Sequence, residues 1–193
     1  MRVVVFGAGG RTGRRVVEQA RERGDDVTAF VRDPTSASAP PGVTLVGGDA
    51  RDPAAVAEAI VGADALISVL ALMSPDAEPE HSEATRTIVG AAGRAGVRRI
   101  VVTANNDVLG DHEVTGEFAP HAREHRRNRD TLRASGLDWT IGAAPWVTDE
   151  PVIGRYDAVV DGKGPGSGSR RPTSRRSRSM PSGAGTGSAT SWG

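Results

Sequence analysis

The sequence predicts an α/β protein whose doubly wound parallel sheet lies between two layers of helices. Short apolar runs alternate with segments whose apolar residues recur at helical spacing, which is the pattern of strand and helix in turn. Several runs are apolar at every position, as strands covered on both faces are. The expected strands are Val3–Phe6, Val27–Val31, Val43–Val46, Ala65–Leu70, Ile100–Thr103 and Trp139–Ile141. The expected helices are Thr12–Arg23, Pro53–Val61, His81–Ala95 and Pro120–Ser135.

Glycine follows or ends each expected helix, just before the chain enters the next strand. Gly24, Gly62, Gly96 and Gly136 hold these positions. Glycine is favoured there because the residue after a helix often takes a left-handed conformation. These glycines therefore support the order of helix and strand.

Composition divides the chain into a folded domain, residues 1–163, and a tail, residues 164–193. The 193 residues are 37% apolar, which suffices for one core. Residues 1–163 carry 19 of the 24 basic and all 24 acidic residues, so the folded part has a net charge of −5. This balance argues against a general nucleic-acid surface on the domain. The absence of cysteine excludes disulfides, thiolate metal ligands and cysteine nucleophiles.

The tail consists almost entirely of Gly, Ser, Arg, Pro and Thr, and we expect it to be disordered. A frameshift near Gly166–Ser169 is a second interpretation. Codons from Arg171 read two bases later, with free third positions, would encode an amphipathic helix. Resequencing of the gene tests this hypothesis.

The chain opens directly into a strand-like run, without a leader pattern, and contains no long uncharged apolar stretch. We therefore expect a cytoplasmic location and no membrane partner. Nucleic acid is expected as a partner only through the basic tail.

The loop "GAGGRTG" lies between the first expected strand and the first expected helix, as in a Rossmann-type nucleotide site. Gly7 permits a tight turn, Gly10 lets the backbone approach a pyrophosphate, and Gly13 allows the helix to pack closely on the strand. Free amides and the positive end of the helix dipole attract phosphate there. A tight strand-to-helix turn without a ligand is the alternative.

The end of the second expected strand favours NADP(H) over NAD(H). Arg32 stands where NAD-selective sites place an acid, and a guanidinium suits a 2′-phosphate. Arg11 could reach the same group from the loop. Asp33 follows immediately and could bind a ribose hydroxyl instead, so NAD(H) stays open.

Residues 1 to about 165 contain six segments in a fixed order: "GAGGRTG", "VTAFVRDP", "GDARDPAAVAEAI", "ADALISVL", "LRASGLDWTI" and "GRYDAVVDGKGP". In this combination the sequence resembles the atypical short-chain dehydrogenase/reductases of the NmrA-like NAD(P)H-binding group, nearest to biliverdin and flavin reductases.

The resemblance implies roles for individual residues. On the pyrophosphate it places Gly7, Gly10, Arg11, Thr12 and Gly13. It places Arg32 on the 2′-phosphate, Asp49 and Ala50 on the adenine, Leu70 and Ala71 beside the adenosine ribose, and Thr103, Ala104 and Pro145 near the nicotinamide.

The sequence departs from the wider superfamily at the catalytic Tyr-x-x-x-Lys pair, where His121 and His125 stand. The candidate catalytic residues are therefore His125 and Thr103. Four residues apart, the two histidines share a helix face, but no metal is expected because acidic ligands are lacking and positive charge surrounds them. Two readings stay open: surface histidines on a charged helix, or an imidazole that donates a proton at the pocket mouth.

The resulting hypothesis is an NADPH-dependent oxidoreductase that transfers hydride to a flavin-like or other planar conjugated acceptor. Such an acceptor needs stacking and exclusion of water more than a dedicated acid, so loss of the Tyr/Lys pair is tolerable. The alternative is a non-catalytic NAD(P)-binding redox sensor of the NmrA-like type.

Overall fold

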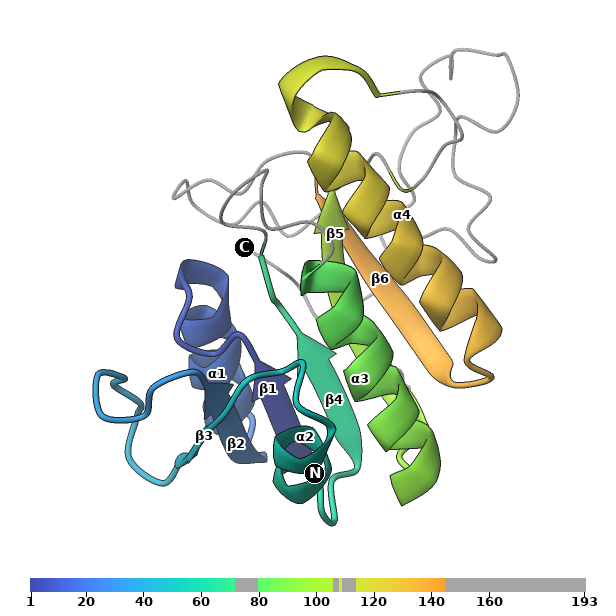
Figure 1. The fold of residues 1–193 in the computed structure, drawn as a ribbon. Helices are drawn as coiled ribbons and strands as arrows, with labels where there is room; N and C mark the ends of the chain where they lie inside the picture. The colour runs from blue at the N-terminus through green and yellow to red at the C-terminus, as the bar shows by residue number, and fades with distance from the viewer. Residues whose placement is uncertain (72–79, 106–107, 109–113, 145–193) are drawn as a thin grey trace, which may run out of the picture.

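A computed structural model describes residues 1–71, 80–105, 108 and 114–144. They form one parallel sheet whose strand order is β3-β2-β1-β4-β5-β6 (Figure 1). Every neighbouring pair is parallel. The strands are β1 (Arg2–Phe6), β2 (Asp26–Val31), β3 (Thr44–Gly47), β4 (Ala65–Ser68), β5 (Arg99–Asn105) and β6 (Asp138–Ala144).

Helices cover both faces of the sheet, as the sequence predicts. On one face α1 (Arg11–Glu22) packs on β1 and β2. The opposite face carries α2 (Pro53–Ala59), α3 (Glu80–Ala95) and α4 (Ala119–Ala134), and a short 3₁₀ turn, η3 (Gly116–Phe118), leads into α4. Figure 1 shows α3 and α4 side by side along this face.

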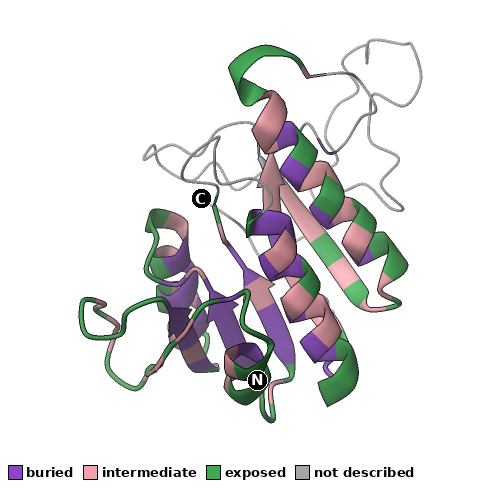
Figure 2. Cartoon of the chain, viewed as in Figure 1, coloured by how far each residue is buried: buried purple, intermediate pink, exposed green. Residues whose placement is uncertain are grey.

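The core follows from the alternation of side chains along the central strand. Val3 and Val5 point toward α1, whereas Val4 and Phe6 point toward α2 and α3. Because both sets are buried, β1 is apolar throughout, as a strand covered on two faces must be. Figure 2 shows this burial along the central strands.

The expected strands and helices are confirmed, with shifts of a few residues at their ends. Strand β4 ends at Ser68 instead of Leu70, while β5 and β6 continue further than their apolar runs. The predicted left-handed caps are also confirmed, since Gly24, Gly62, Gly96 and Gly136 have φ between 68° and 83°.

Two expectations lie outside the described residues. These are the disordered tail with its frameshift hypothesis, and the placement of Pro145 near the nicotinamide. No helix within the described ranges is long and apolar enough to cross a membrane.

Candidate functional site

The predicted cofactor residues gather at one edge of the sheet, where the parallel strands end. Loop residues Gly7–Gly10 follow β1, Arg32 follows β2, Asp49 follows β3, and Leu70 lies beyond β4. Thr103 and Ala104 lie near the carboxyl end of β5, where this strand pairs with β6. In doubly wound sheets ligands bind beyond this edge, at the point where the strand order reverses. Here that point lies between β1 and β4.

Gly7 and Gly13 are glycines because the protein itself leaves no room for a side chain. A Cβ at Gly13 would lie 2.1 Å from the Gly7 carbonyl oxygen, so α1 packs directly on the loop. Gly7 has φ of 78°, and its Cβ would lie 2.9 Å from the Val69 carbonyl oxygen. These two contacts fix the loop against the ends of β1 and β4.

Packing within the described residues does not require glycine at position 10. Its φ is −75°, and a Cβ there would reach only ordinary contact, 3.4 Å from the Gly7 oxygen. It is also exposed. A bare, exposed backbone at the start of α1 fits the close approach of a pyrophosphate, so the residues present suit the expected cofactor.

The start of α1 differs from the start of α2. Asp52 caps α2, since its carboxylate accepts a hydrogen bond from the Ala54 N–H at 2.9 Å. Among the described residues no side chain caps α1, whose first turn contains no acid. The positive end of the α1 dipole therefore faces the loop with no acidic residue in the first turn of the helix itself.

Arg32 and Asp33, the two residues that follow β2, differ in their contacts. The Asp33 carboxylate accepts hydrogen bonds from the Thr35 N–H at 2.9 Å and the Thr35 hydroxyl at 2.6 Å. These bonds lower the pKa of Asp33 and hold it in a local turn. Arg32 is exposed, and its charge contributes to lowering the pKa of Asp49. A cationic group thus stands at the strand end while the neighbouring acid is engaged.

Asp49, predicted to contact the adenine, is bound by Arg51. The carboxylate accepts from the Arg51 main-chain N–H at 2.8 Å and from its guanidinium at 2.6 to 3.1 Å. The hydrogen bonds from Arg51 lower the pKa of Asp49. The same guanidinium also pairs with Glu80 at 3.0 Å. An adenine amino group that donates to Asp49 would therefore meet a carboxylate that Arg51 already holds in a fixed orientation. Ala50 beside it is buried, at 8% exposure.

Thr103, a candidate catalytic residue, is half-buried near the end of β5. Its hydroxyl lies 3.5 Å from the Ser68 carbonyl oxygen, a long contact to the neighbouring strand. Ala104 follows it in the same strand, while Leu70 is half-buried and Ala71 exposed beyond β4. The structure therefore brings these four residues to the same edge.

His125 and His121 lie on α4, facing a third histidine at the start of α3. The rings of His81 and His125 meet edge to face, with centroids 5.3 Å apart and planes at 87°. Burial, followed by the neighbouring imidazoles, lowers the pKa of His125 to about 4. Burial also lowers the pKa of His81. At neutral pH both rings are therefore uncharged. His125 can donate a hydrogen bond through its one ring N–H, but it is not protonated and so is not a general acid.

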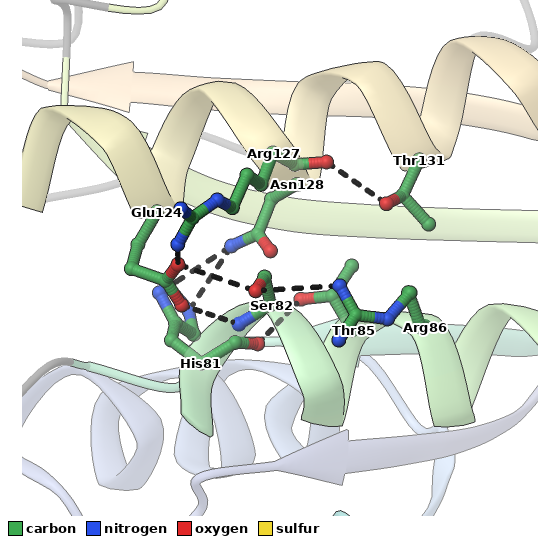
Figure 3. Close-up of polar contacts among 8 residues, drawn as sticks. All are labelled: His81, Ser82, Thr85, Arg86, Glu124, Arg127, Asn128 and Thr131. Carbon is green, nitrogen blue, oxygen red and sulfur yellow. Dashed lines mark hydrogen bonds and ion pairs between the residues drawn. The ribbon is translucent and has the colours of Figure 1, made fainter. Parts of the chain in front are cut away.

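Beside this imidazole cluster (His81, His121 and His125), Glu124 joins α4 to the first turn of α3 (Figure 3). Its side chain is fully buried and accepts from the Ser82 N–H at 2.8 Å and the Ser82 hydroxyl at 3.2 Å. Arg127, one turn further on, pairs with the same carboxylate. The buried charge is thus compensated by an ion pair and by the start of a helix.

Sequence reasoning missed His81, Glu124 and Asn128, which are all at most 5% exposed. The segment "HAREHRRNRD" looks like a solvated face because of its charge. The available signal was spacing: His121, His125, Asn128 and Leu132 are separated by four, three and four residues, which places them on one helix face. No group of three His, Cys, Asp or Glu side chains among the described residues is arranged to hold a metal ion.

Comparison with known proteins shows the family to which the chain belongs. The pattern of a family described as NAD(P)H-binding matches residues 7–177. Sterol demethylase protein B of Methylococcus capsulatus is 28% identical over 80% of this chain and 56% of its own length. Quinone oxidoreductase 2 of Escherichia coli is 27% identical over 83% of this chain and 54% of its own length. The chain thus spans about half the length of these curated relatives.

Solved structures share the fold. The oxidoreductase YlbE of Lactococcus lactis superposes with a TM-score of 0.73 at 20% identity, over 80% of this chain and 73% of its own. SP1627 of Streptococcus pneumoniae, a candidate NADH-flavin reductase, superposes with a TM-score of 0.59 at 26% identity, over 73% of this chain and 70% of its own. An NAD-bound short-chain dehydrogenase/reductase superfamily protein of Agrobacterium tumefaciens superposes with a TM-score of 0.62 at 25% identity, over 73% of this chain and 48% of its own.

Proposed function

Because the chain belongs to the NAD(P)H-binding family, as its resemblance to NmrA-like proteins predicts, we propose that it is an NADPH-dependent reductase of planar conjugated acceptors such as flavins. The observation that carries the proposal is the glycine loop. It presents an exposed backbone at Gly10 and an uncapped start of α1, held in place by the tight packing of Gly7 and Gly13.

The preference for NADPH rests on the two residues that follow β2. Arg32 is an exposed cation at the position that faces the adenosine ribose in this fold, and a guanidinium binds phosphate through paired N–H donors. Asp33, the residue that could bind ribose hydroxyls in NAD(H), is already bonded to Thr35. The site therefore offers a cation for the 2′-phosphate, beside a carboxylate whose Oδ1 is already used in a local turn.

The choice of acceptor rests on the imidazole cluster. Bound NADPH would supply a hydride, and the chain would have to orient the acceptor and exclude water. His125, uncharged at neutral pH, can donate a hydrogen bond without acting as a strong acid. An acceptor that can take its proton from water, as flavins and quinones can, is compatible with this. Quinone and flavin also occur in the names of two relatives.

The test is a titration with NADPH and NADH, followed by steady-state NADPH oxidation with FMN as acceptor. We expect tighter binding of NADPH and turnover stimulated by FMN. Arg32→Ala should weaken NADPH binding by about tenfold or more, since a charge-assisted hydrogen bond contributes roughly 1.5 to 3 kcal/mol, and should leave NADH binding unchanged.

Arg94→Ala is the matched control, because Arg94 is an exposed arginine in the last turn of α3, at the opposite edge of the sheet. Equal affinities for NADPH and NADH that Arg32→Ala does not alter would overturn the cofactor preference. NADPH binding without turnover, and with equal affinity for the oxidised form, would instead favour a redox sensor.

A further inference from the structure

We propose that Arg51 is a positioning residue that makes this site select an adenine base, because its guanidinium holds the Asp49 carboxylate as a fixed acceptor for the adenine amino group. The inference rests on the proposed function, in which the cofactor is a dinucleotide. Arg51 lies two residues beyond Asp49, in the loop between β3 and α2.

Asp49 lies where the base of such a dinucleotide would come. In this fold the pyrophosphate binds at the loop after the first strand, and the adenosine ribose binds at the end of the second. Here β3 is the next strand outward, and Asp49 follows it. The charge of Arg32, which follows β2, contributes to lowering the pKa of Asp49. A base attached to a ribose beside Arg32 can therefore reach the Asp49 carboxylate.

Arg51 binds both oxygens of that carboxylate and leaves room for one more donor. Its main-chain N–H donates to Oδ1 at 2.8 Å, its Nε lies 3.0 Å from Oδ1 and 3.1 Å from Oδ2, and its Nη2 donates to Oδ2 at 2.6 Å. Three N–H donors thus bind a group that can accept about four hydrogen bonds. The paired guanidinium donors fix the plane of the carboxylate. The remaining acceptor position suits an amino group and disfavours a carbonyl oxygen.

Helix α3 anchors Arg51 from its other side. The Nη1 atom pairs with Glu80 Oε1 at 3.0 Å, in the first turn of that helix. Further along α3, the Thr87 hydroxyl lies 3.4 Å from the Arg51 carbonyl oxygen, a long contact to the main chain. A guanidinium held between Glu80 and Asp49 has little freedom to turn. The orientation of the Asp49 carboxylate is therefore set before a cofactor binds, which lowers the entropy lost on binding.

These ion pairs are not needed to keep the protein folded. The side chains of Arg51, Asp49 and Glu80 are 41%, 45% and 56% exposed. Exposed ion pairs contribute little to stability, because solvent screens them. Substitution of Arg51 should therefore leave the domain folded, and its effect should be found in ligand binding.

The test measures the Kd of NADPH and the Kd of its hypoxanthine analogue, in which a carbonyl oxygen replaces the adenine amino group. We expect the wild type to bind NADPH about tenfold more tightly, since the analogue lacks a charge-assisted hydrogen bond. In Arg51→Ala this preference should fall to within about threefold, because the carboxylate loses its paired donors. The ratio of the two Kd values is the readout, since loss of a cation weakens the binding of both phosphorylated ligands alike.

Arg99→Ala is the matched control. Arg99 also pairs with an aspartate, Asp138 at 3.7 Å, but it begins β5 at the opposite edge of the sheet. This variant should keep the tenfold preference. Arg51→Lys keeps the charge but lacks the paired donors, so it should resemble Arg51→Ala. An unchanged ratio in Arg51→Ala, or a full preference in Arg51→Lys, would overturn the positioning role.

A second readout needs no cofactor. In carbon-detected magnetic resonance of the unliganded wild type, the pKa of the Asp49 carboxyl should lie below 3.8. It should rise toward 3.8 in Arg51→Ala but not in Arg99→Ala. An Asp49 whose pKa is not lowered in the wild type would show that Arg51 does not hold the carboxylate, and the inference would fail.

The two proposals can fail separately. Turnover with FMN by a wild type that binds both dinucleotides equally well would refute the positioning role alone. A tenfold preference for NADPH over the hypoxanthine analogue, without any turnover, would refute the proposed reductase function alone.

Discussion

The glycine loop and the imidazole cluster hold their parts of the site by opposite means. In the loop, positions are fixed by the absence of side chains: Gly13 touches the Gly7 carbonyl so closely that even a methyl group is excluded. In and around the cluster, positions are fixed by buried polar side chains: His81 within it, and Glu124 and Asn128 beside it. Both regions lie at the same edge of the sheet.

The difference teaches where each region is vulnerable. A backbone contact has no charge to titrate, so the loop should respond to added volume and not to pH. The cluster contains uncharged imidazoles next to a buried carboxylate, so it should respond to protonation and to loss of a single hydrogen bond. Three changes test this contrast.

The largest effect is expected from Gly13→Ala. The added Cβ would lie 2.1 Å from the Gly7 oxygen and 2.7 Å from the Ala8 Cα, both main-chain atoms that cannot move aside without displacing the loop. We expect a loss of about 3 kcal/mol or more in the free energy of unfolding, measured by urea denaturation, since overpacking alone costs about 1 to 3 kcal/mol. NADPH binding should fall below detection.

Gly93→Ala is the matched control within α3. A Cβ at Gly93 meets no atom within 4 Å, and alanine is the better helix former by up to about 1 kcal/mol. This variant should be neutral or more stable than the wild type. If Gly13→Ala were equally harmless, the description of the loop as a rigid, sterically fixed cradle would be wrong.

The next effect is a loss of stability on acidification. The pKa of His125 is about 4 in the folded protein against 6.5 for an ordinary histidine, and that of His81 is lowered as well. Below pH 6.5 the unfolded chain therefore binds protons that the folded chain excludes. Stability should fall as the pH drops from about 6.5 to 4, by roughly 2 to 3 kcal/mol from His125, at 1.36 kcal/mol for each pKa unit.

Urea denaturation at pH 7, 5 and 4 measures this loss. The lowered pKa values of Asp33 and Asp49 mean that their contribution is lost mainly as the pH falls through and below their unfolded pKa of 3.8, so the loss between pH 6.5 and 5 belongs to the histidines. His125→Phe removes the titrating group and should flatten the profile over the same window. A wild-type profile that is flat between pH 6.5 and 4 would contradict the uncharged state of His81 and His125.

A smaller effect is expected from Glu124→Gln. The amide keeps an acceptor for the Ser82 N–H but loses the charge that pairs with Arg127, so we expect a loss of about 1 to 2 kcal/mol at pH 7. The Glu124 charge also raises the pKa of both His81 and His125, so their pKa values should fall further in the variant. Histidine titration by nuclear magnetic resonance measures the second effect.

Glu80→Gln serves as its control, because Glu80 lies in the same first turn of α3 but pairs with Arg51 at the surface. Exposed ion pairs contribute little, so no measurable change in stability is expected. Equal effects of the two substitutions would show that burial of Glu124 does not matter for the α3–α4 junction.

The contrast between the two regions also explains what could be predicted from the sequence. The strands, the helices and the left-handed glycine caps follow local rules, because apolar spacing and glycine conformations depend on neighbouring residues. The glycine loop is local as well, and Gly7 and Gly13 lie only six residues apart. Arg32 could be expected near the loop because the carboxyl ends of parallel strands share one edge, whereas Asp49 was expected there through the family resemblance.

The imidazole cluster could not be predicted because its contacts are distant in sequence. His81 and Asn128 are 47 residues apart, and Ser82 and Glu124 are 42 apart. Nothing near His81 indicates that its ring is buried, and the five arginines around Glu124 make that segment look exposed. The packing of α3 on α4 brings these side chains together, and the burial that results lowers the pKa of His81 and His125.

The position of β1 at the centre of the sheet has a consequence for how the chain matures. Strand β1 pairs with β2 on one side and with β4 on the other, through Val3 to Ala65 and Phe6 to Ser68. During synthesis β1 must therefore wait for β4, which begins at Ala65, before both of its edges are paired. Until then an apolar strand remains open on one side, and an unpaired apolar edge of this kind favours aggregation of incomplete chains.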